Sequence, residues 1–107
     1  MGKRRTPIVT GGEPDHSARL RHAIPVAILD LHGFRTERAR QRLRGFLERE
    51  ARNHGGQAVQ VITGKGSRSP DGPRLRPMVL EELANQEAVV AEWEISLDRG
   101  SVFVRLR

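Results

Sequence analysis

Two polar residues with a chemically useful spacing stand at the end of a short apolar segment. Asp30 and His32 follow the apolar residues 26–29 and directly precede Gly33. In a β-strand, residues i and i+2 point to the same side, so both polar side chains would face one way. An aspartate beside a histidine fixes the imidazole tautomer and favours the protonated ring, which suits a histidine that transfers protons. The alternative is an aspartate that caps the turn beside a merely surface-exposed histidine.

A second polar segment follows the next apolar run. It consists of Thr63, Gly64, Lys65, Gly66, Ser67, Arg68 and Ser69. Closely spaced glycines let backbone N–H groups turn toward an anion, and a lysine between them adds a mobile charge. Lys65 is one of only two lysines among 19 lysines and arginines, which favours a compact point charge at this position. The segment is neither a Walker A loop nor a dinucleotide fingerprint. It predicts phosphate binding, with a plain flexible loop as the alternative.

Hydrophobic periodicity predicts the elements that must hold these segments. The continuous apolar run 26–29 favours a strand buried on both faces, and residues 58–63 form a second strand. Thr36 is expected to cap a helix that extends to residue 53. The apolar face of this helix comprises Ala39, Leu43, Phe46, Leu47 and Ala51.

The second half of the chain predicts another helix and two more strands. Pro73 suits the first turn of a helix whose apolar face comprises Leu75, Met78, Val79 and Leu83. Alternating apolar residues predict strands over 89–95 and 102–106, joined by a hairpin turn at 97–100. The order β-α-β-α-β-β predicts an α/β (α+β) two-layer sandwich, in which two helices pack on a mixed four-stranded sheet.

The predicted connections bring the two polar segments together. If the first two strands are parallel neighbours joined by the first helix, both segments emerge at the same edge of the sheet. Asp30, His32 and residues 64–66 would then share one cleft. A phosphate-binding loop beside an acid/base pair is a coherent site for phosphodiester chemistry.

Length and composition indicate one domain preceded by a tail. The chain has 107 residues, of which 36% are hydrophobic and 30% charged, within the range of ordinary globular proteins. Residues 1–23 are polar and basic and are expected to form a flexible tail, followed by a domain over 24–107. The absence of cysteine excludes disulfides and thiol catalysis. No apolar run approaches the roughly 20 residues of a membrane span. We expect a cytoplasmic, monomeric protein with no membrane partner.

The charge balance favours a polyanionic partner. The formal net charge is +6, which is typical of nucleic-acid-binding proteins, although a genomic bias toward arginine is an alternative cause. Arg38, Arg42, Arg49 and Arg52 form roughly one stripe on the first helix. Arg38 and Arg42 are expected to contact phosphates, and a solvated face interleaved with Glu48 and Glu50 is the alternative. Three phenylalanines, one tryptophan and no tyrosine offer no platform for base stacking.

The motifs resemble those of the Smr (small MutS-related) domain family over roughly residues 26–106. The matching residues are Leu29, Asp30, Leu31, His32, Gly33, Glu37 and Ala39, then Ile62 to Gly66 with Ser69 and Gly72, then Leu75, Arg76 and Val79. The resemblance implies a fold similar to the C-terminal domain of translation initiation factor three. It also implies nuclease activity on DNA or RNA, since family members occur in a MutS paralogue and in bacterial proteins linked to mRNA cleavage at stalled ribosomes.

The resemblance places catalysis on Asp30 and His32 and substrate binding on the glycine loop. The expected phosphate-binding set is Gly33, Arg38, Arg42, Thr63, Gly64, Lys65, Gly66, Ser67, Arg68 and Ser69. Two side chains are too few to hold a metal tightly, so we expect no resident cofactor and Mg²⁺ recruited with the substrate. The expected partners are RNA or DNA and the ribosome.

Two departures from the family pattern bear on activity. Arg68 stands where many members carry histidine, and the family's glycine-rich segment before the last strand is reduced to residues 98–101. If that segment is one wall of the cleft, cleavage would be weakened. A non-catalytic RNA-, ribosome- or DNA-binding module linked to ribosome rescue or DNA repair is therefore the second hypothesis. A structural domain whose charge reflects only genomic bias is the third.

Overall fold

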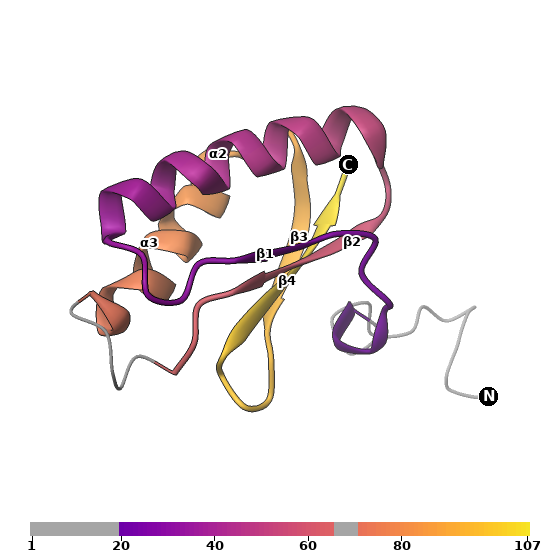
Figure 1. Ribbon diagram of the computed structural model, residues 1–107. Coiled ribbons are helices and arrows are strands. Elements are labelled where there is room, and N and C mark those ends of the chain that lie inside the picture. Colours follow the sequence, from indigo (N-terminus) through magenta and orange to yellow (C-terminus); the bar gives the residue numbers. More distant parts are fainter. Residues whose placement is uncertain (1–19, 66–70) are drawn as a thin grey trace.

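A computed structural model describes residues 20–65 and 71–107 (Figure 1). Its elements are β1 (Ile28–Asp30), α2 (Thr36–Asn53), β2 (Ala58–Ile62), α3 (Gly72–Asn85), β3 (Val90–Ile95) and β4 (Ser101–Leu106). The predicted order of strands and helices is therefore confirmed. No helix among the described residues is both long and apolar enough to cross a membrane.

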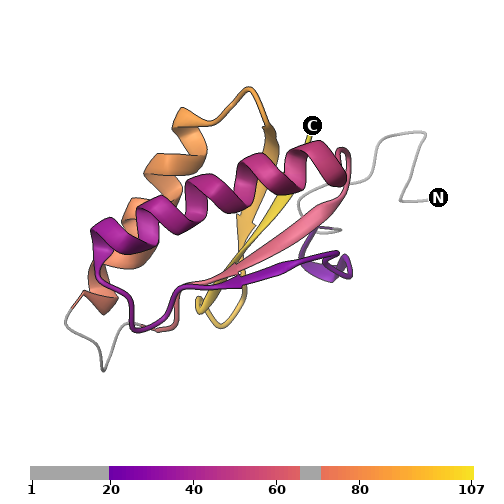
Figure 2. The ribbon, with the colours of Figure 1, turned by 45° about the horizontal axis from the view of Figure 1, so that its top comes forward.

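The sheet is mixed and carries both helices on one face. Its strand order is β1-β2-β4-β3, with β1 parallel to β2 and the other neighbours antiparallel. Leu29 pairs with Val61, and Val61 pairs with Val102, so the register is continuous across three strands. Figure 2 shows α2 and α3 side by side over the sheet. This is the expected two-layer sandwich.

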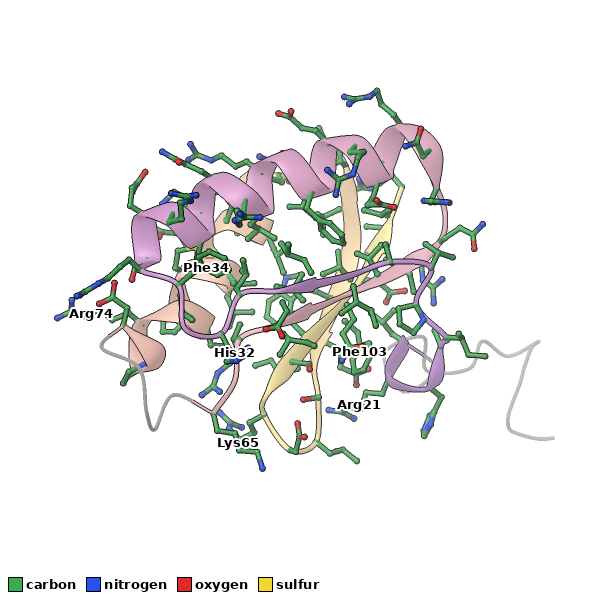
Figure 3. The ribbon with its side chains drawn as sticks, in the orientation of Figure 1. Arg21, His32, Phe34, Lys65, Arg74 and Phe103 are labelled. Carbon is green, nitrogen blue, oxygen red and sulfur yellow. The ribbon has the colours of Figure 1, made fainter. Side chains whose placement is uncertain are left out.

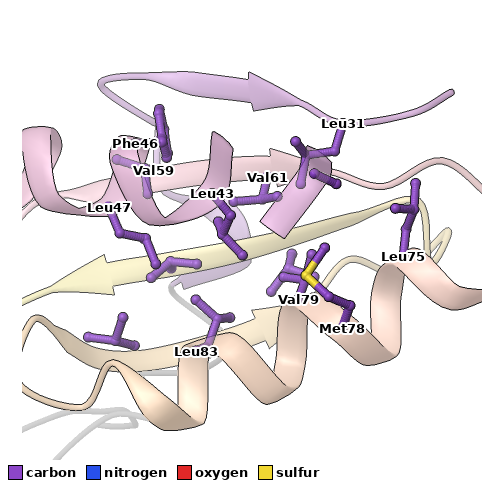
Figure 4. Packing of buried hydrophobic residues seen from close by; sticks show 14 of the residues in the cluster. Leu31, Leu43, Phe46, Leu47, Val59, Val61, Leu75, Met78, Val79 and Leu83 are labelled. Carbon is purple, nitrogen blue, oxygen red and sulfur yellow. The ribbon is translucent and has the colours of Figure 1, made fainter. Parts of the chain in front are cut away.

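The core fills the space between the helices and the sheet (Figure 4). Leu43 and Leu47 of α2, Leu75 and Val79 of α3, and Val61 of β2 are all fully buried in one cluster. The helical residues recur every three or four positions because one stripe of each helix faces the sheet. Burying such a side chain stabilises the fold by about 1.5–3 kcal/mol.

β1 differs from the prediction of a strand buried on both faces. Ile28 is 56% exposed and Val26 is 40% exposed, whereas Leu31 is fully buried. β1 is an edge strand, and the helices cover only the face that carries Leu29 and Leu31. A continuous apolar run indicates two covered faces only when helices pack on both sides of the sheet. The prediction was wrong because neither α2 nor α3 covers the other face of β1, where Ile28 stays largely exposed.

The predicted cap of α2 was also wrong. The N-cap residue is Arg35, which makes no capping hydrogen bond with its side chain, and Thr36 is the first helical residue. The backbone N–H and the hydroxyl of Thr36 both donate to Asp71 Oδ2, at 2.7 and 3.0 Å. A carboxylate from another segment thus satisfies an N–H group that has no partner within the helix.

The start of the described chain packs against the sheet. Residues 20–22 form a helical turn. Arg21 Nη1 lies 2.9 Å from Glu94 Oε2, and its Nε donates to the carbonyl oxygen of Ile95 at 3.1 Å. The rest of the predicted tail, residues 1–19, lies outside the described residues.

A buried carboxylate joins the two helices. Glu82 of α3 is 1% exposed, and its Oε2 accepts a hydrogen bond from Arg44 Nε at 2.7 Å. Arg40 Nη1 donates to Oε1 at 3.4 Å, and Gln86 Nε2 donates to Oε2 at 3.3 Å. The hydrogen bond from Arg44 lowers the pKa of Glu82 most strongly, against the opposing effect of burial. Two arginines of α2 therefore serve the helix interface.

We expect Glu82→Gln to lower the free energy of unfolding by about 1–3 kcal/mol at neutral pH, because it removes charge-assisted hydrogen bonds from a buried site. Glu81→Gln is the matched control, since Glu81 is largely exposed and its carboxylate lies 3.7 Å from Arg40 Nη1. Urea unfolding at several pH values measures both effects.

The pH dependence has a definite sign. Because folding lowers the pKa of Glu82, its stabilisation is present at neutral pH and is lost as the pH falls through the folded-state pKa. The unaltered protein and Glu82→Gln should therefore converge in stability toward acid pH. Equal losses in Glu82→Gln and Glu81→Gln would contradict this account of the interface.

Candidate functional site

The two polar segments emerge at the same edge of the sheet. Asp30 ends β1, and Thr63, Gly64 and Lys65 follow β2. The backbone N–H of Leu31 donates to the carbonyl oxygen of Ile62 at 2.7 Å, so the parallel pairing continues into both segments. Figure 3 shows the side chains of His32 and Lys65 near this edge. The structure thus brings together the two segments that the sequence predicted would converge.

The segments are in direct contact. Gly64 has a φ of +77°, and a Cβ atom placed on it would lie 3.2 Å from the Cβ of His32. This is tighter than ordinary van der Waals contact. The backbone conformation favours glycine here, and a Cβ on residue 64 would also force His32 to shift by a few tenths of an ångström.

Asp30 and His32 are coupled by a short hydrogen bond. His32 Nδ1 lies 2.6 Å from Asp30 Oδ1, and the same oxygen accepts the backbone N–H of His32 at 3.1 Å. An ionised aspartate accepts hydrogen bonds and does not donate them, so the proton resides on Nδ1 and Nε2 is left for another partner. The side chains of His32 and Asp30 are 69% and 49% exposed, so a large ligand can reach both. This arrangement suits a general acid or base.

The turn after His32 is held by its neighbours. Gly33 has a φ of +85°, and the backbone N–H of Phe34 donates to the carbonyl oxygen of Leu31 at 3.1 Å. The guanidinium carbon of Arg42 lies 4.8 Å from the centre of the Phe34 ring. Arg42, predicted to contact phosphates, is therefore positioned beside this turn by a cation–π contact.

The first part of the glycine loop is occupied with backbone contacts. The N–H groups of Thr63 and Gly64 both donate to the carbonyl oxygen of Gly100, at 3.0 Å each. The Gly64 N–H is therefore turned toward the sheet, and the close approach to His32 explains its glycine. Thr63 is 2% exposed, and its hydroxyl donates to the carbonyl oxygen of Gly64 at 3.1 Å. Gly66, Ser67, Arg68 and Ser69 lie outside the described residues.

Lys65 lies beside the turn between β3 and β4. A Cβ on Gly100 would be 3.8 Å from Lys65 Cγ, and Lys65 is exposed. Asp98 Oδ1 accepts hydrogen bonds from Ser96 Oγ at 2.7 Å and from the Gly100 N–H at 2.9 Å. These bonds lower the pKa of Asp98, and the charge of Lys65 adds to the effect. The shortened segment 98–101 thus borders the glycine loop.

Asp71 links the start of α2 to the start of α3. It accepts hydrogen bonds from Thr36 at the start of α2, as described above, and is itself the residue before α3. The nearest guanidinium nitrogens of Arg35 and Arg74 lie 3.8 and 3.9 Å from Asp71 Oδ1. The backbone hydrogen bond from Thr36 is the largest cause of the lowered pKa of Asp71. The sequence pattern Asp-Gly-Pro marks a helix start, but it does not indicate that the carboxylate caps a different helix.

The arginines of α2 divide into three groups. Arg49 Nε lies 3.4 Å from Oε2 of Glu50 on the same helix. Arg40 and Arg44 pair with Glu82, whereas Arg38, Arg42 and Arg52 have no carboxylate within 4.0 Å among the residues that the structure describes.

The same part of the chain contains no group of three histidine, aspartate or glutamate side chains arranged to hold a metal.

Comparison with known proteins gives consistent results. Residues 29–107 match the model of the Smr domain. An uncharacterized protein of Treponema pallidum (strain Nichols) is 43% identical over 61 residues, which are 57% of this chain and 30% of that protein. The chain thus spans less than a third of this curated relative.

A solved structure agrees with the fold. The crystal structure of the human small-MutS related domain aligns with a TM-score of 0.57 and 28% identity, covering 74% of this chain and 99% of that domain.

Replacement of Gly64 tests the contact with His32. Gly64→Ala should cost about 1–2 kcal/mol through its positive φ and should also shift the imidazole proton resonances of His32. Gly56→Ala is the matched control, because Gly56 has a φ of +83° and a Cβ placed on it would meet no described atom within 4 Å. NMR spectra and urea unfolding of both variants measure the two effects. Unchanged His32 resonances in Gly64→Ala would refute the contact.

Replacement of Asp71 tests the link between the loops. Asp71→Asn should lower the melting temperature at neutral pH and accelerate hydrogen exchange of the Thr36 amide, since the charged acceptor is lost. Because folding lowers the pKa of Asp71, its stabilisation is lost as the pH falls through the folded-state value, and the difference should shrink.

Glu48→Gln serves as control, since Glu48 is exposed on α2. It should leave both properties unchanged. A melting-temperature difference between Asp71→Asn and the unaltered protein that persisted at acid pH would show that the charge of Asp71 is not the cause.

Proposed function

The chain belongs to the Smr domain family, a family of nucleases and nucleic-acid-binding domains, and we propose that it is an endonuclease that cleaves phosphodiester bonds in RNA or DNA. The observation that carries the proposal is the 2.6 Å hydrogen bond between His32 Nδ1 and Asp30 Oδ1, which leaves Nε2 for a substrate beside the glycine loop.

His32 is the proposed general acid and base, and Asp30 is its positioning residue. On RNA, Nε2 takes the proton of a 2′-hydroxyl, whose oxygen attacks the adjacent phosphorus while the bond to the 5′-oxygen breaks. The protonated imidazole then supplies a proton to that leaving oxygen. Asp30 keeps the ring oriented, with Nδ1 as the donor to its carboxylate and Nε2 toward the substrate. DNA lacks the 2′-hydroxyl, so there the nucleophile would be water.

Lys65 is the proposed phosphate contact of the described part of the loop. Its exposed ammonium group extends from the segment that touches His32. A positive charge near the scissile phosphate stabilises the extra negative charge of the transition state. The net charge of +6 attracts the polyanion before any specific contact forms.

The described residues at this edge do not by themselves form a magnesium site. Oδ1 of Asp30 is engaged by His32, and Mg²⁺ requires several oxygen ligands in octahedral geometry. We therefore propose that any Mg²⁺ arrives with the substrate, and the steps above are derived from protein groups alone.

A non-catalytic module that binds RNA, the ribosome or DNA is the second candidate. It is favoured by the Gly64 N–H, which bonds to Gly100 and so does not contribute to a phosphate cradle. Such a module would use the same basic surface and would retain binding after loss of His32.

Cleavage assays with RNA and DNA separate the two candidates. End-labelled single strands are incubated with the protein in Mg²⁺ or in EDTA. His32→Ala should reduce the rate at least about 100-fold, because general acid–base catalysis contributes factors of about 10²–10⁴. His22→Ala is the matched control, since His22 lies on the helical turn at residues 20–22 and should leave the rate unchanged.

Each outcome has a defined meaning. Cleavage of RNA in EDTA would support attack by the 2′-hydroxyl, whereas cleavage of DNA only in Mg²⁺ would support water as the nucleophile. Binding without cleavage would support the non-catalytic module. Equal cleavage by the unaltered protein and by His32→Ala would refute the role of His32.

A further inference from the structure

An arginine stripe lies on the side of α2 that is not used by α3. Arg38, Arg42, Arg49 and Arg52 are exposed and, with Gly45, are spaced by four, three, four and three residues. This spacing places all five positions on one face of a helix. We call this set the α2 stripe.

The α2 stripe is separate from the structural ion pairs of the same helix. Arg40 and Arg44 point toward Glu82 of α3. Glu50, which the alternative interpretation of the sequence interleaves with the stripe, is 7% exposed, and its Oε1 lies 2.6 Å from His54 Nδ1. The carboxylate of Glu50 is therefore turned toward the protein interior. Its only ion pair with the stripe among the described residues is between Oε2 and Arg49 Nε, at 3.4 Å. The exposed Glu48 borders the stripe four residues before Arg52, and four arginines against these two glutamates leave the stripe positive on balance.

Gly45 is not required by the fold. A Cβ atom on Gly45 would meet no described atom within 4 Å, and its φ is not in the left-handed region. A glycine in a helix is less stable than most other residues because of its backbone freedom. Because Gly45 has no side chain, a bound ligand can approach the helix backbone closely between Arg42 and Arg49.

The stripe begins at the candidate active site. Arg42 stacks on Phe34, which lies two residues after His32. In Figure 1, α2 runs from this turn along the sheet toward the opposite end. With a rise of about 1.5 Å per residue, Arg38 and Arg52 are about 21 Å apart along the helix. At about 3.4 Å per nucleotide, that length spans about six nucleotides of a duplex strand.

The contact chemistry favours the nucleic-acid backbone over its bases. The Phe34 ring lies under Arg42, and the Phe46 ring is buried with the guanidinium carbon of Arg49 at 5.7 Å, so each ring already has an arginine against it. Guanidinium groups bind phosphate oxygens without reading sequence.

We propose that the α2 stripe docks the phosphate backbone of a substrate strand several nucleotides from the bond that His32 would cleave. This inference rests on the proposed nucleic-acid substrate. The stripe makes affinity depend on substrate length and leaves it independent of sequence. Gly45 is the point of closest approach of the strand to the helix.

Binding as a function of length and salt tests the inference. Fluorescence anisotropy is measured with labelled oligonucleotides of about four and about 16 nucleotides, single-stranded and duplex. Arg38→Gln/Arg52→Gln should weaken binding of the longer strand about tenfold at low salt and reduce the slope of log K against log salt by about 1.4 for single strands. The advantage of the longer strand over the shorter one should shrink.

Two further variants serve as controls. Arg105→Gln/Arg107→Gln removes the same charge from β4 and the C-terminal residue, and should leave affinity and slope nearly unchanged. Gly45→Gln keeps the charge and should raise the melting temperature, because glutamine is the better helix former, yet weaken binding of the longer strand at least about threefold by blocking close approach.

The outcomes distinguish this inference from the proposed nuclease activity. Unchanged affinity and salt slope in Arg38→Gln/Arg52→Gln would overturn the docking surface, whatever the cleavage assay shows. An equal loss in Arg105→Gln/Arg107→Gln would overturn it too, since net charge alone would then be the cause. Stripe-dependent binding without His32-dependent cleavage would support docking and refute the nuclease.

Discussion

The parallel pairing of β1 with β2 is the constraint on which the candidate site depends. Three residue pairs form this ladder, from Ile28–Gln60 to Asp30–Ile62. The ladder brings the carboxyl ends of both strands to one edge, where His32 and Gly64 touch. A one-residue shift in register would turn Asp30 and His32 toward the helices and Leu31 toward solvent. Burial of Leu31 in the core therefore fixes the exposure of the polar pair.

Both helices begin near this edge of the sheet and are linked to each other. α2 starts three residues after Gly33, and α3 starts directly after Asp71. Asp71 bonds to Thr36 across this gap, and Glu82 holds the helices together farther along. Helix α2 thus has two basic faces. The arginines on one face are neutralised by Glu82 of α3, and those of the α2 stripe on the other face are exposed. A polyanion would meet the exposed face.

The sequence predicted the order of elements, most of the buried positions of both helices and the convergence of the two polar segments. These features follow from local periodicity and from the short connections between strands. Ala51, expected on the buried face of α2, is only half-buried, and Glu50 takes a buried position instead. The exposed outer face of β1 was not predictable, because an apolar run does not tell which faces a helix will cover. The bond between Asp71 and Thr36 was also missed, since it joins residues 35 positions apart.

The glycine loop shows a further limit of reasoning from sequence. A glycine beside a lysine is typical of anion binding, and the pattern does not tell whether a backbone N–H faces a ligand or a neighbouring strand. Here the Gly64 N–H bonds to Gly100, which the shortened segment 98–101 supplies. The roles of Asp30, His32 and Lys65 rest on their geometry and on the family, and stay predictions.

The central claim is that Nε2 of His32 meets the phosphodiester group of the substrate. Proton–nitrogen correlation spectra of the imidazole rings, recorded while a non-cleavable 2′-O-methyl oligonucleotide is added, test it most directly. The account predicts that the Nε2 resonance of His32 shifts as the oligonucleotide saturates the protein, while that of His22 changes little. Saturable binding that leaves His32 unaffected would contradict it.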